Sequence, residues 1–174
     1  MIDFSNPARL YDLLTFCVDT NTAVVIATTG LSEEQEIRIK DVSKKIPVFK
    51  SSNTSLGINL VLDLVRKSTN ILNEAFDIEI IEKHHNKKID APSGTAYMIA
   101  QAINEEMSNE MVYNYGREGK NSKRNKNEIG IHAVRGGSIV GEHTVIFAGM
   151  DEIIEIKHTA LSKGVFARGA IKAA

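Results

Sequence analysis

The sequence predicts an α/β protein in two parts: a partial doubly wound parallel sheet over residues 1–55, and an α+β part with a mixed four-stranded sheet over residues 56–163. Residues 1–55 alternate short apolar runs with helical patterns, the rhythm of a βαβαβ unit with right-handed crossovers. Residues 76–82 instead alternate apolar and charged side chains, as expected of a strand with one buried face. Three further strand candidates follow, at residues 129–134, 139–147 and 152–158.

The first 55 residues contain the start signals of two helices. Asn6 can cap a helix whose first residue is Pro7, and residues 32–35 form a capping box that opens the second helix. Residues 23–26 are a continuous apolar run, typical of a parallel strand covered on both faces, and residues 47–49 are a short strand. The buried stripe of the first helix, at helical spacing, consists of Leu10, Leu13, Leu14, Cys17 and Val18.

Small polar residues follow two of these strands, at residues 28–30 and 51–54. Ligands of doubly wound sheets bind beyond the carboxyl ends of the strands. Hydroxyl groups and accessible amides at these positions could therefore hold a ribose or a nicotinamide. From these residues alone, ordinary strand-to-helix turns are the simpler interpretation.

An amphipathic helix is predicted over residues 55–72, and a strand with two histidines at its end follows it. Glu82 and His84 lie on one face of this strand, and His85 lies on the other. A carboxylate beside an imidazole favours the protonated ring, so Glu82 could make His84 a proton donor near neutral pH, starting from a pKa of about 6.5. The alternative remains open, because a bare pair of adjacent histidines is more often a surface or core feature.

Ser93 is a good N-cap for the next predicted helix, whose apolar residues follow at helical spacing. The amides of Gly94 and Thr95 would then lie unpaired at a helix N-terminus, where they favour an anion such as a carboxylate or phosphate. Lys88 could add a full positive charge to the same site. By itself, a Ser-Gly-Thr helix start is usually only a cap. The apolar residues are Ala96, Ile99, Ala100, Ile103 and Met107.

Residues 108–128 are polar and include a basic cluster of Lys120, Lys123, Arg124 and Lys126. Such a cluster can bind anions, but a solvated loop is the simpler interpretation. Gly149 lies between the last two strand candidates and indicates a hairpin. Of the histidines on these strands, His132 and His158 are assigned no catalytic role, and His143 is a candidate for the wall of a pocket.

The composition excludes several classes of function. With 21 basic and 22 acidic side chains in 174 residues, no broad electrostatic field favours nucleic acid or an anionic membrane. No apolar run approaches the length of a membrane span, and the first residues lack a signal-peptide pattern. Cys17 is the only cysteine, which fits a reducing compartment. We therefore expect a cytoplasmic protein without nucleic-acid or membrane partners, and no metal, because no ligand set has the right spacing.

The segment from Glu82 to Ala96 is Glu-Lys-His-His-Asn-Lys-Lys-Ile-Asp-Ala-Pro-Ser-Gly-Thr-Ala. It closely resembles the signature of the 4-hydroxy-tetrahydrodipicolinate reductase (dihydrodipicolinate reductase) family, nicotinamide-dependent oxidoreductases of the diaminopimelate route of lysine biosynthesis. The density of this pattern makes it far more specific than a lone glycine-rich loop. Further segments resemble the family in the family's order, at residues 2–7, 27–30, 51–55 and 135–144.

The resemblance implies three parts of the chain. Residues 1–55 are the remainder of a Rossmann-type dinucleotide-binding domain, residues 56–163 a substrate-binding and tetramerisation domain, and residues 164–174 the start of a helix that returns to the first domain. It also implies a homotetramer whose mixed sheets meet at the centre, and NADH or NADPH as cofactor. The implied substrate is a small cyclic unsaturated dicarboxylate (dihydrodipicolinate or 4-hydroxy-tetrahydrodipicolinate), which is reduced to tetrahydrodipicolinate.

By resemblance, His84 is the proton donor or acceptor and Lys88 a second proton donor or charge stabiliser, while His85, Gly94 and Thr95 bind a substrate carboxylate. The implied cofactor contacts are Ala27, Thr28, Thr29, Ser51, Ser52, Asn53 and Thr54. Two of these depart from the family, because Ala27 stands where many members have glycine and Thr54 where an aromatic residue is often seen. We expect the departures to change cofactor affinity without removing binding.

No glycine-rich fingerprint of the type G-x-G-x-x-G or G-x-x-G-x-x-G lies between a strand and a helix of this sequence. In the family, that loop and the residue that distinguishes NADH from NADPH would precede Met1. We therefore expect a fragment that begins inside the nucleotide-binding domain. The alternative hypothesis is a catalytically silent assembly or anion-binding module derived from the family, and NADH binding with and without a dicarboxylate analogue separates the two. A dehydrogenase of another type would need a different catalytic set, which the sequence does not offer.

Overall fold

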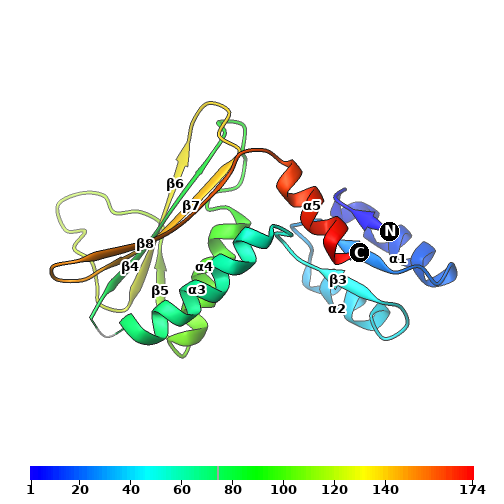
Figure 1. Cartoon of the computed structure of the whole chain (residues 1–174), viewed down its shortest axis with the longest axis horizontal. Coiled ribbons are helices and arrows are strands. Elements are labelled where there is room, and N and C mark those ends of the chain that lie inside the picture. The colour runs from blue at the N-terminus through cyan, green and yellow to red at the C-terminus, as the bar shows by residue number, and fades with distance from the viewer. Residues whose placement is uncertain (74) are drawn as a thin grey trace. The chain divides into compact units, whose positions relative to one another are not determined.

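The chain folds into two compact units (Figure 1). The computed structural model describes residues 1–73 and 75–174. The first unit comprises residues 1–56 and 164–174, and the second comprises residues 57–163. Within this described part of the chain, no helix is both long enough and apolar enough to cross a bilayer.

The first unit contains a parallel sheet with the strand order β1-β2-β3. The predicted helix starts are confirmed: Asn6 accepts a hydrogen bond from the amide of Ala8, and Ser32 and Gln35 form a reciprocal capping box. The core residues are Leu10, Leu14, Cys17, Val24, Ile26, Ile39, Val42 and Ile46. The elements are β1 (Ile2–Asp3), the 3-10 helix η1 (Pro7–Arg9), α1 (Leu10–Asp19), β2 (Val24–Ile26), α2 (Glu33–Val42), β3 (Val48–Lys50) and α5 (Gly164–Ala173).

The second unit contains a mixed sheet with the strand order β5-β6-β4-β7-β8. Its central strand β4 is parallel to β6 and antiparallel to β7. The predicted α/β class is therefore confirmed, but the sheet has five strands and not four. The additional strand, β5, has only three residues in a polar segment, which is too short for an alternating pattern to be recognised. The elements are α3 (Leu56–Leu72), β4 (Asp77–His84), α4 (Gly94–Glu106), β5 (Val112–Asn114), β6 (Glu128–Arg135), β7 (Gly141–Ala148) and β8 (Ile153–Ala160).

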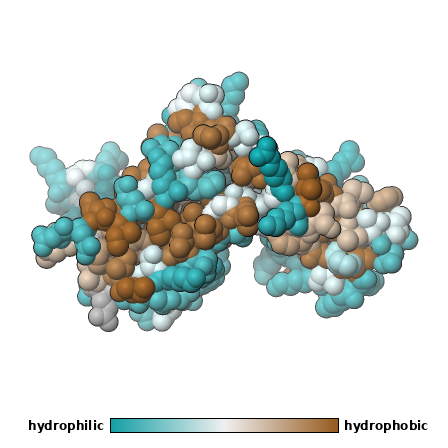
Figure 2. Space-filling view, viewed as in Figure 1, coloured by the Kyte–Doolittle hydropathy of each residue, from teal (hydrophilic) through white to brown (hydrophobic). Residues whose placement is uncertain are grey.

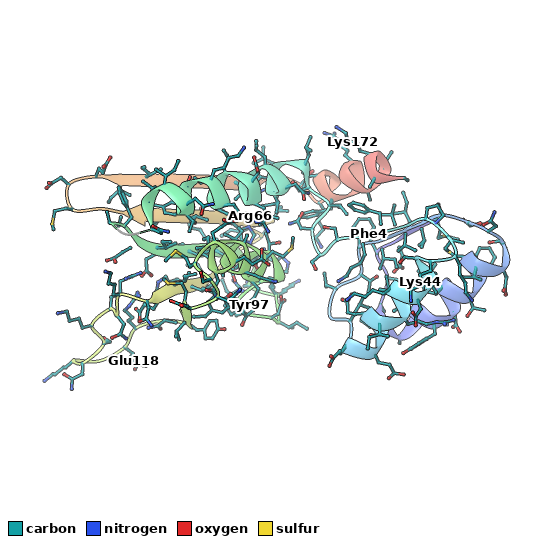
Figure 3. All side chains as sticks on the ribbon, turned by 90° about the horizontal axis from the view of Figure 1, so that it is seen from below. Phe4, Lys44, Arg66, Tyr97, Glu118 and Lys172 are labelled. Carbon is teal, nitrogen blue, oxygen red and sulfur yellow. The ribbon has the colours of Figure 1, made fainter. Side chains whose placement is uncertain are left out.

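Helices α3 and α4 cover one face of the mixed sheet, and Figure 3 shows their side chains, with Arg66 of α3 and Tyr97 of α4 labelled. We call this face of the sheet the inner face. Ile78 and Ile80 of β4 lie on it in register with Ile129 and Ile131 of β6, and all four are buried. Hydrophobic surface also remains over α3 (Figure 2), which carries the exposed side chains of Leu60, Leu64 and Ile71.

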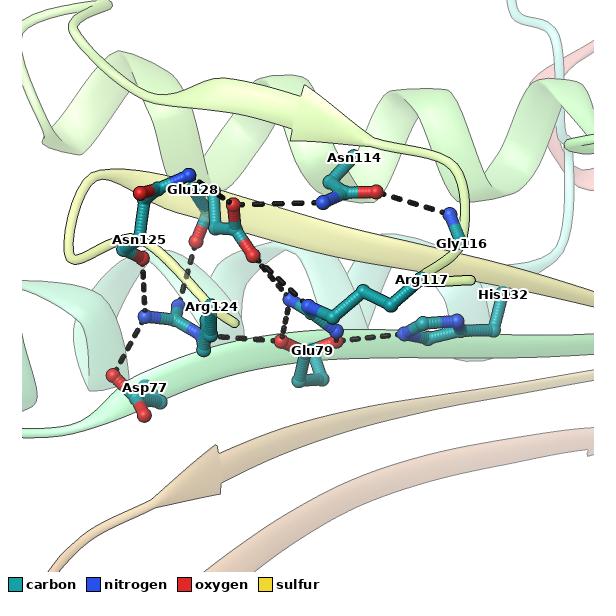
Figure 4. A network of polar contacts seen from close by, with 9 residues as sticks. All are labelled: Asp77, Glu79, Asn114, Gly116, Arg117, Arg124, Asn125, Glu128 and His132. Carbon is teal, nitrogen blue, oxygen red and sulfur yellow. Dashed lines mark hydrogen bonds and ion pairs between the residues drawn. The ribbon is translucent and has the colours of Figure 1, made fainter. Parts of the chain in front are cut away.

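The opposite, outer face of the sheet carries a polar network centred on Glu79 (Figure 4). Arg117 binds Glu79 through both Nη atoms, at 3.0 and 2.7 Å, and also donates to Glu128. Arg124 donates to Glu79 at 3.1 Å, and Nε2 of His132 lies 2.7 Å from the same carboxylate. Burial alone would raise the pKa of Glu79, but the hydrogen bonds from Arg117 and His132 outweigh it and lower the pKa. The carboxylate therefore stays ionised. Through Arg117 and Arg124 it holds the segment between β5 and β6 against the sheet.

This network corrects one prediction about the basic cluster. Lys120, Lys123 and Lys126 are exposed, as a solvated loop requires, but the Arg124 side chain is only 17% exposed. The role of Arg124 could not be predicted from the sequence, because its partners Asp77 and Glu79 lie more than forty residues earlier in the chain. The loop still extends away from the sheet at Glu118 (Figure 3).

Replacement of Glu79 by alanine should destabilise the second unit, because it leaves Arg117 and Arg124 without their shared carboxylate. We expect a loss of about 2 kcal/mol in the free energy of unfolding, less than for a fully buried pair because the groups retain some solvent. Urea unfolding followed by tyrosine fluorescence measures this, since three of the four tyrosines lie in residues 57–163. Asp63→Ala, which breaks an exposed pair with Lys67 on α3, is the control and should cost less than about 0.5 kcal/mol. Equal losses in the two variants would contradict the structural role of the network.

Candidate active site

The buried carboxylate of Glu82 lies at the centre of the candidate site, at the inner face of β4. Its side chain is 0% exposed. Both oxygens accept from Arg135, at 2.6 and 2.7 Å, one accepts from the amide of Ser93 at 3.0 Å, and the other lies 2.6 Å from Nδ1 of His84. Burial raises the pKa of Glu82, but the hydrogen bonds from Arg135 and His84 outweigh it, so the pKa is lowered and the group is ionised. The prediction that Glu82 and His84 share one strand face is confirmed.

The imidazole of His84 is fixed in orientation and tautomer by this carboxylate. An ionised Glu82 only accepts hydrogen bonds, so Nδ1 of His84 carries the donated hydrogen and Nε2 is left as the atom that can gain or lose a proton. The Nε2 side of the ring lies over Gly141 of β7, where an added Cβ would come within 3.2 Å of Nε2. Glycine at this position therefore leaves Nε2 of His84 uncrowded.

The net pKa shift of His84 differs from the sequence-based prediction. Glu82 raises the pKa of the ring, as expected, but desolvation by burial lowers it more strongly, and the positive charges of Lys88 and Arg135 act in the same direction. The predicted effect of Glu82 on His84 is therefore present, but it does not decide the net direction of the pKa shift. The sequence could not reveal this because the burial and the Arg135 contact come from distant segments.

Lys88 belongs to the same cluster of charges. Its Nζ atom lies 2.8 Å from a carboxylate oxygen of Asp90, and its side chain is 21% exposed. Its charge lowers the pKa of both His84 and His143. Arg135 also donates to the carbonyl of Asp90 at 2.8 Å, so the same guanidinium holds Glu82 and the loop that carries Lys88.

The predicted start of α4 is confirmed, with Ser93 as its N-cap accepting from the amide of Ala96. Gly94 is exposed, and nothing lies within 4 Å of the position that a Cβ would occupy. Thr95 is half-buried at the same helix end. His85 is half-buried on the preceding loop, and its buried Nδ1 has no hydrogen-bond partner among the described residues. There is room for a ligand at this helix start.

The residues assigned to cofactor binding all lie in the first unit, on the loops after β2 and β3. Thr29 and Ser52 are exposed, and Ala27 and Ser51 are half-buried. The other three side chains are engaged within the unit. Thr28 donates to Asp3 at 2.6 Å, Asn53 accepts from the amide of Ser55 at 2.9 Å, and Thr54 donates to the carbonyl of Phe166 at 2.7 Å.

The sequence did not indicate roles for Arg135 and Gly141. Arg135 lies at the end of β6 beside His84, a neighbour that only the parallel pairing of β4 with β6 creates. Gly141 lies at the start of β7. The need for glycine at this position is apparent only from the fold, which places the His84 ring next to it. Both belong to segment 135–144, whose family resemblance was the one available signal.

A parallel sheet with polar loops after its strands, joined in one chain to a mixed sheet with a histidine–carboxylate site, is the arrangement of a nicotinamide-dependent oxidoreductase. Two family models match the chain, "Dihydrodipicolinate reductase, N-terminus" over residues 1–54 and "Dihydrodipicolinate reductase, C-terminus" over residues 57–174. The chain belongs to the dihydrodipicolinate reductase family. The resemblance of residues 82–96 to this family is thereby confirmed, as is the expectation of NADH or NADPH, which reductases of this family use.

Relatives named 4-hydroxy-tetrahydrodipicolinate reductase act in lysine and diaminopimelate biosynthesis. That of Clostridium novyi is 56% identical over 173 residues, which are 99% of this chain and 68% of that protein. That of Caldanaerobacter subterraneus is 55% identical over 100% of this chain and 69% of that protein. Among solved structures, the dipicolinate-bound dihydrodipicolinate reductase from Paenisporosarcina sp. TG-14 has a TM-score of 0.74 at 25% identity, over 98% of this chain and 65% of that one. The chain thus spans about two thirds of the length of these relatives.

The stability of the second unit should fall as the pH falls from about 6.5 to 4. Burial lowers the pKa of His143 to about 4, so the unfolded chain binds more protons than the folded chain in this window. This group alone should remove about 3 kcal/mol from the free energy of unfolding by pH 4. Urea unfolding at several pH values should show a smaller loss for His143→Gln. This variant retains the contributions of His84 and His158, whose pKa values burial also lowers, and, near pH 4, those of carboxylates with lowered pKa values such as Glu79 and Glu82. An identical pH dependence in both proteins would contradict the assignment to His143.

Proposed function

We propose that this chain carries the substrate pocket and the proton-transfer group of a 4-hydroxy-tetrahydrodipicolinate reductase, acting on a small cyclic dicarboxylate. The observation that supports it is the clustering of His84, Lys88 and the open helix start at Gly94 around the buried Glu82, all within residues 57–163. Dipicolinate is a planar ring with two carboxylates, and it is the ligand bound to the Paenisporosarcina reductase. A cytoplasmic location is part of the same proposal, because the reaction draws on NADH or NADPH.

Two separate groups in the site suit the two carboxylates of such a ligand. One carboxylate accepts hydrogen bonds from the helix start at Gly94 and Thr95, where the helix dipole also favours an anion. The other pairs with Lys88, in competition with Asp90, and with His85. A ligand that carried only one carboxylate could engage only one of these two groups.

In this proposal, Nε2 of His84 takes up the proton when the substrate binds and then delivers it. In the ligand-free site burial keeps the pKa of this ring below its usual value. A bound dianion adds negative charge beside the ring and opposes the effect of Lys88 and Arg135, so the pKa rises and the ring takes up a proton. Glu82 stabilises the resulting imidazolium through Nδ1, and Nε2 then donates the proton to the reduced substrate.

The exposed loops of the first unit fit a dinucleotide. Thr29 and Ser52 offer hydroxyl groups after two parallel strands, and Gly30, with a φ of 76°, leaves open space where a Cβ would be. Thr28, Asn53 and Thr54 use side-chain groups in internal hydrogen bonds, and the amide of Asn53 also donates to Ser51. Cofactor contacts of this unit would therefore come mainly from the exposed Thr29 and Ser52. The chemistry that bound NADH or NADPH supplies is a hydride.

The outer face of the mixed sheet fits self-association into the homotetramer. Among the described residues, no helix covers it, and Ile81 and Ile146 lie half-buried on it. Most of its charged groups are already paired within the chain, in the Glu79 network and in the pairs of Glu142 with Lys83 and Lys157. Glu155, opposite Ile146 on β8, is exposed and forms no salt bridge among the described residues. Covering this face would therefore bury apolar surface at little electrostatic cost, provided that Glu155 keeps its solvent or meets a cation of the partner.

Ile146→Asp should dissociate the assembly, because it places an unpaired carboxylate in the covered face. Sedimentation velocity at micromolar concentration measures the mass of the particle. Ile71→Asp is the control, since it makes the same change at an exposed position on α3, and it should keep the wild-type mass. A monomeric wild-type chain, or an unchanged mass for Ile146→Asp, would contradict the proposal.

His84→Gln should lower turnover by about 10²- to 10⁴-fold with the fold intact, because glutamine cannot exchange the proton. It should also abolish proton uptake on dipicolinate binding. Calorimetric titrations in two buffers of different ionisation enthalpy, at pH values near and above the lowered pKa of His84, measure this uptake directly and require no turnover. Wild-type turnover or unchanged proton uptake in His84→Gln would remove His84 from the role.

A further inference from the structure

We propose that His143 is a positioning residue that ties the proton-carrying ring of His84 to the helix start that receives the substrate carboxylate. The inference rests on the proposed function, and it concerns a histidine to which the proposed reaction gives no part. His143 lies on the inner face of β7, is 4% exposed, and pairs with Glu82 across the sheet.

A closed ring of contacts runs through His143. Its Nε2 lies 2.9 Å from Oγ of Ser93, the amide of Ser93 donates to Glu82 at 3.0 Å, and Glu82 holds Nδ1 of His84 at 2.6 Å. The ring closes where His84 and His143 meet edge to face, with centroids 5.2 Å apart and an interplanar angle of 72°. Three segments distant in sequence are thus locked together at one point.

Packing alone does not account for a histidine at this position. The next two inner-face positions of β7, Val145 and Phe147, are buried hydrophobic residues of the core. Burying an imidazole costs the free energy of its hydration, a cost that an apolar side chain does not have. In addition, Nδ1 of His143 has no hydrogen-bond partner among the described residues. The compensating contact is the hydrogen bond to Ser93, the residue that also caps α4.

The charge state of His143 suits a positioning role beside a proton carrier. Burial lowers the pKa of His143 to about 4, and the neighbouring charges on it are those of His84, Glu82, His158 and Lys88. The ring is therefore neutral near pH 7. A neutral ring can hold Ser93 and support His84 without repelling the imidazolium that His84 becomes.

The test compares His143→Leu with His143→Gln in the full chain. The glutamine amide can reach Ser93 in place of Nε2, whereas leucine fills the space without a polar atom. We expect His143→Leu to weaken dipicolinate binding about 10-fold, as for the loss of one buried hydrogen bond, and His143→Gln to stay within about 3-fold of wild type. Calorimetry measures the affinity, and nitrogen NMR of the histidine rings measures the tautomer and titration of His84, which should change in His143→Leu only.

The control is His132→Leu, which removes a histidine from the outer face and should leave both readouts unchanged. If His143→Leu does not fold, Ser93→Ala breaks the same bond from the other side, and combining it with His143→Gln should weaken binding no further. Wild-type affinity and an unchanged His84 titration in His143→Leu, or in Ser93→Ala, would overturn the inference, as would equal damage from glutamine and leucine. A wild-type chain that does not bind dipicolinate would instead refute the proposed function, and the His84 titration would still decide the role of His143.

Discussion

The burial of one ionised carboxylate, Glu82, is the constraint on which the candidate site depends. A carboxylate removed from water is tolerated only when charged and hydrogen-bonding partners replace the lost solvation. Here the partners come from β6, from the start of α4 and from β4 itself, through Arg135, Ser93 and His84. Satisfying this one group therefore fixes the relative positions of the strand, the loop and the helix that form the site.

The same constraint explains why the site is electrostatically balanced and not simply acidic. Arg135 pairs with Glu82 and itself lowers the pKa of His84, so the rise in pKa that Glu82 causes is opposed, and desolvation by burial decides the net shift. Lys88 adds a further positive charge. A cluster with this balance favours a neutral ring until an anionic ligand arrives, and ligand binding and protonation then become linked.

Local signals in the sequence predicted much of this structure, and long-range pairing accounts for what they missed. The capping box at Ser32, the cap at Ser93 and the shared face of Glu82 and His84 depend on residues close in the chain. The burial of Arg124 and the contact of Arg135 with Glu82 depend on strand neighbours more than forty residues apart. The assignment of the site came from the density of residues 82–96, and its electrostatics became visible only with the fold.

Strand β4 shows why a histidine–carboxylate pair is not sufficient for such a site. Glu79 lies 2.7 Å from His132 on the outer face, and Glu82 lies 2.6 Å from His84 on the inner face, so the local chemistry is the same. Two arginines bind the carboxylate of Glu79. Among the described residues, no helix starts beside His132, and no lysine ion pair lies next to it. At His84, the uncrowded Nε2 over Gly141, the charge of Lys88 and the open helix start at Gly94 meet in one place. The two pairs therefore differ in the open space and in the additional positive charge beside the histidine, and only the pair at His84 has both.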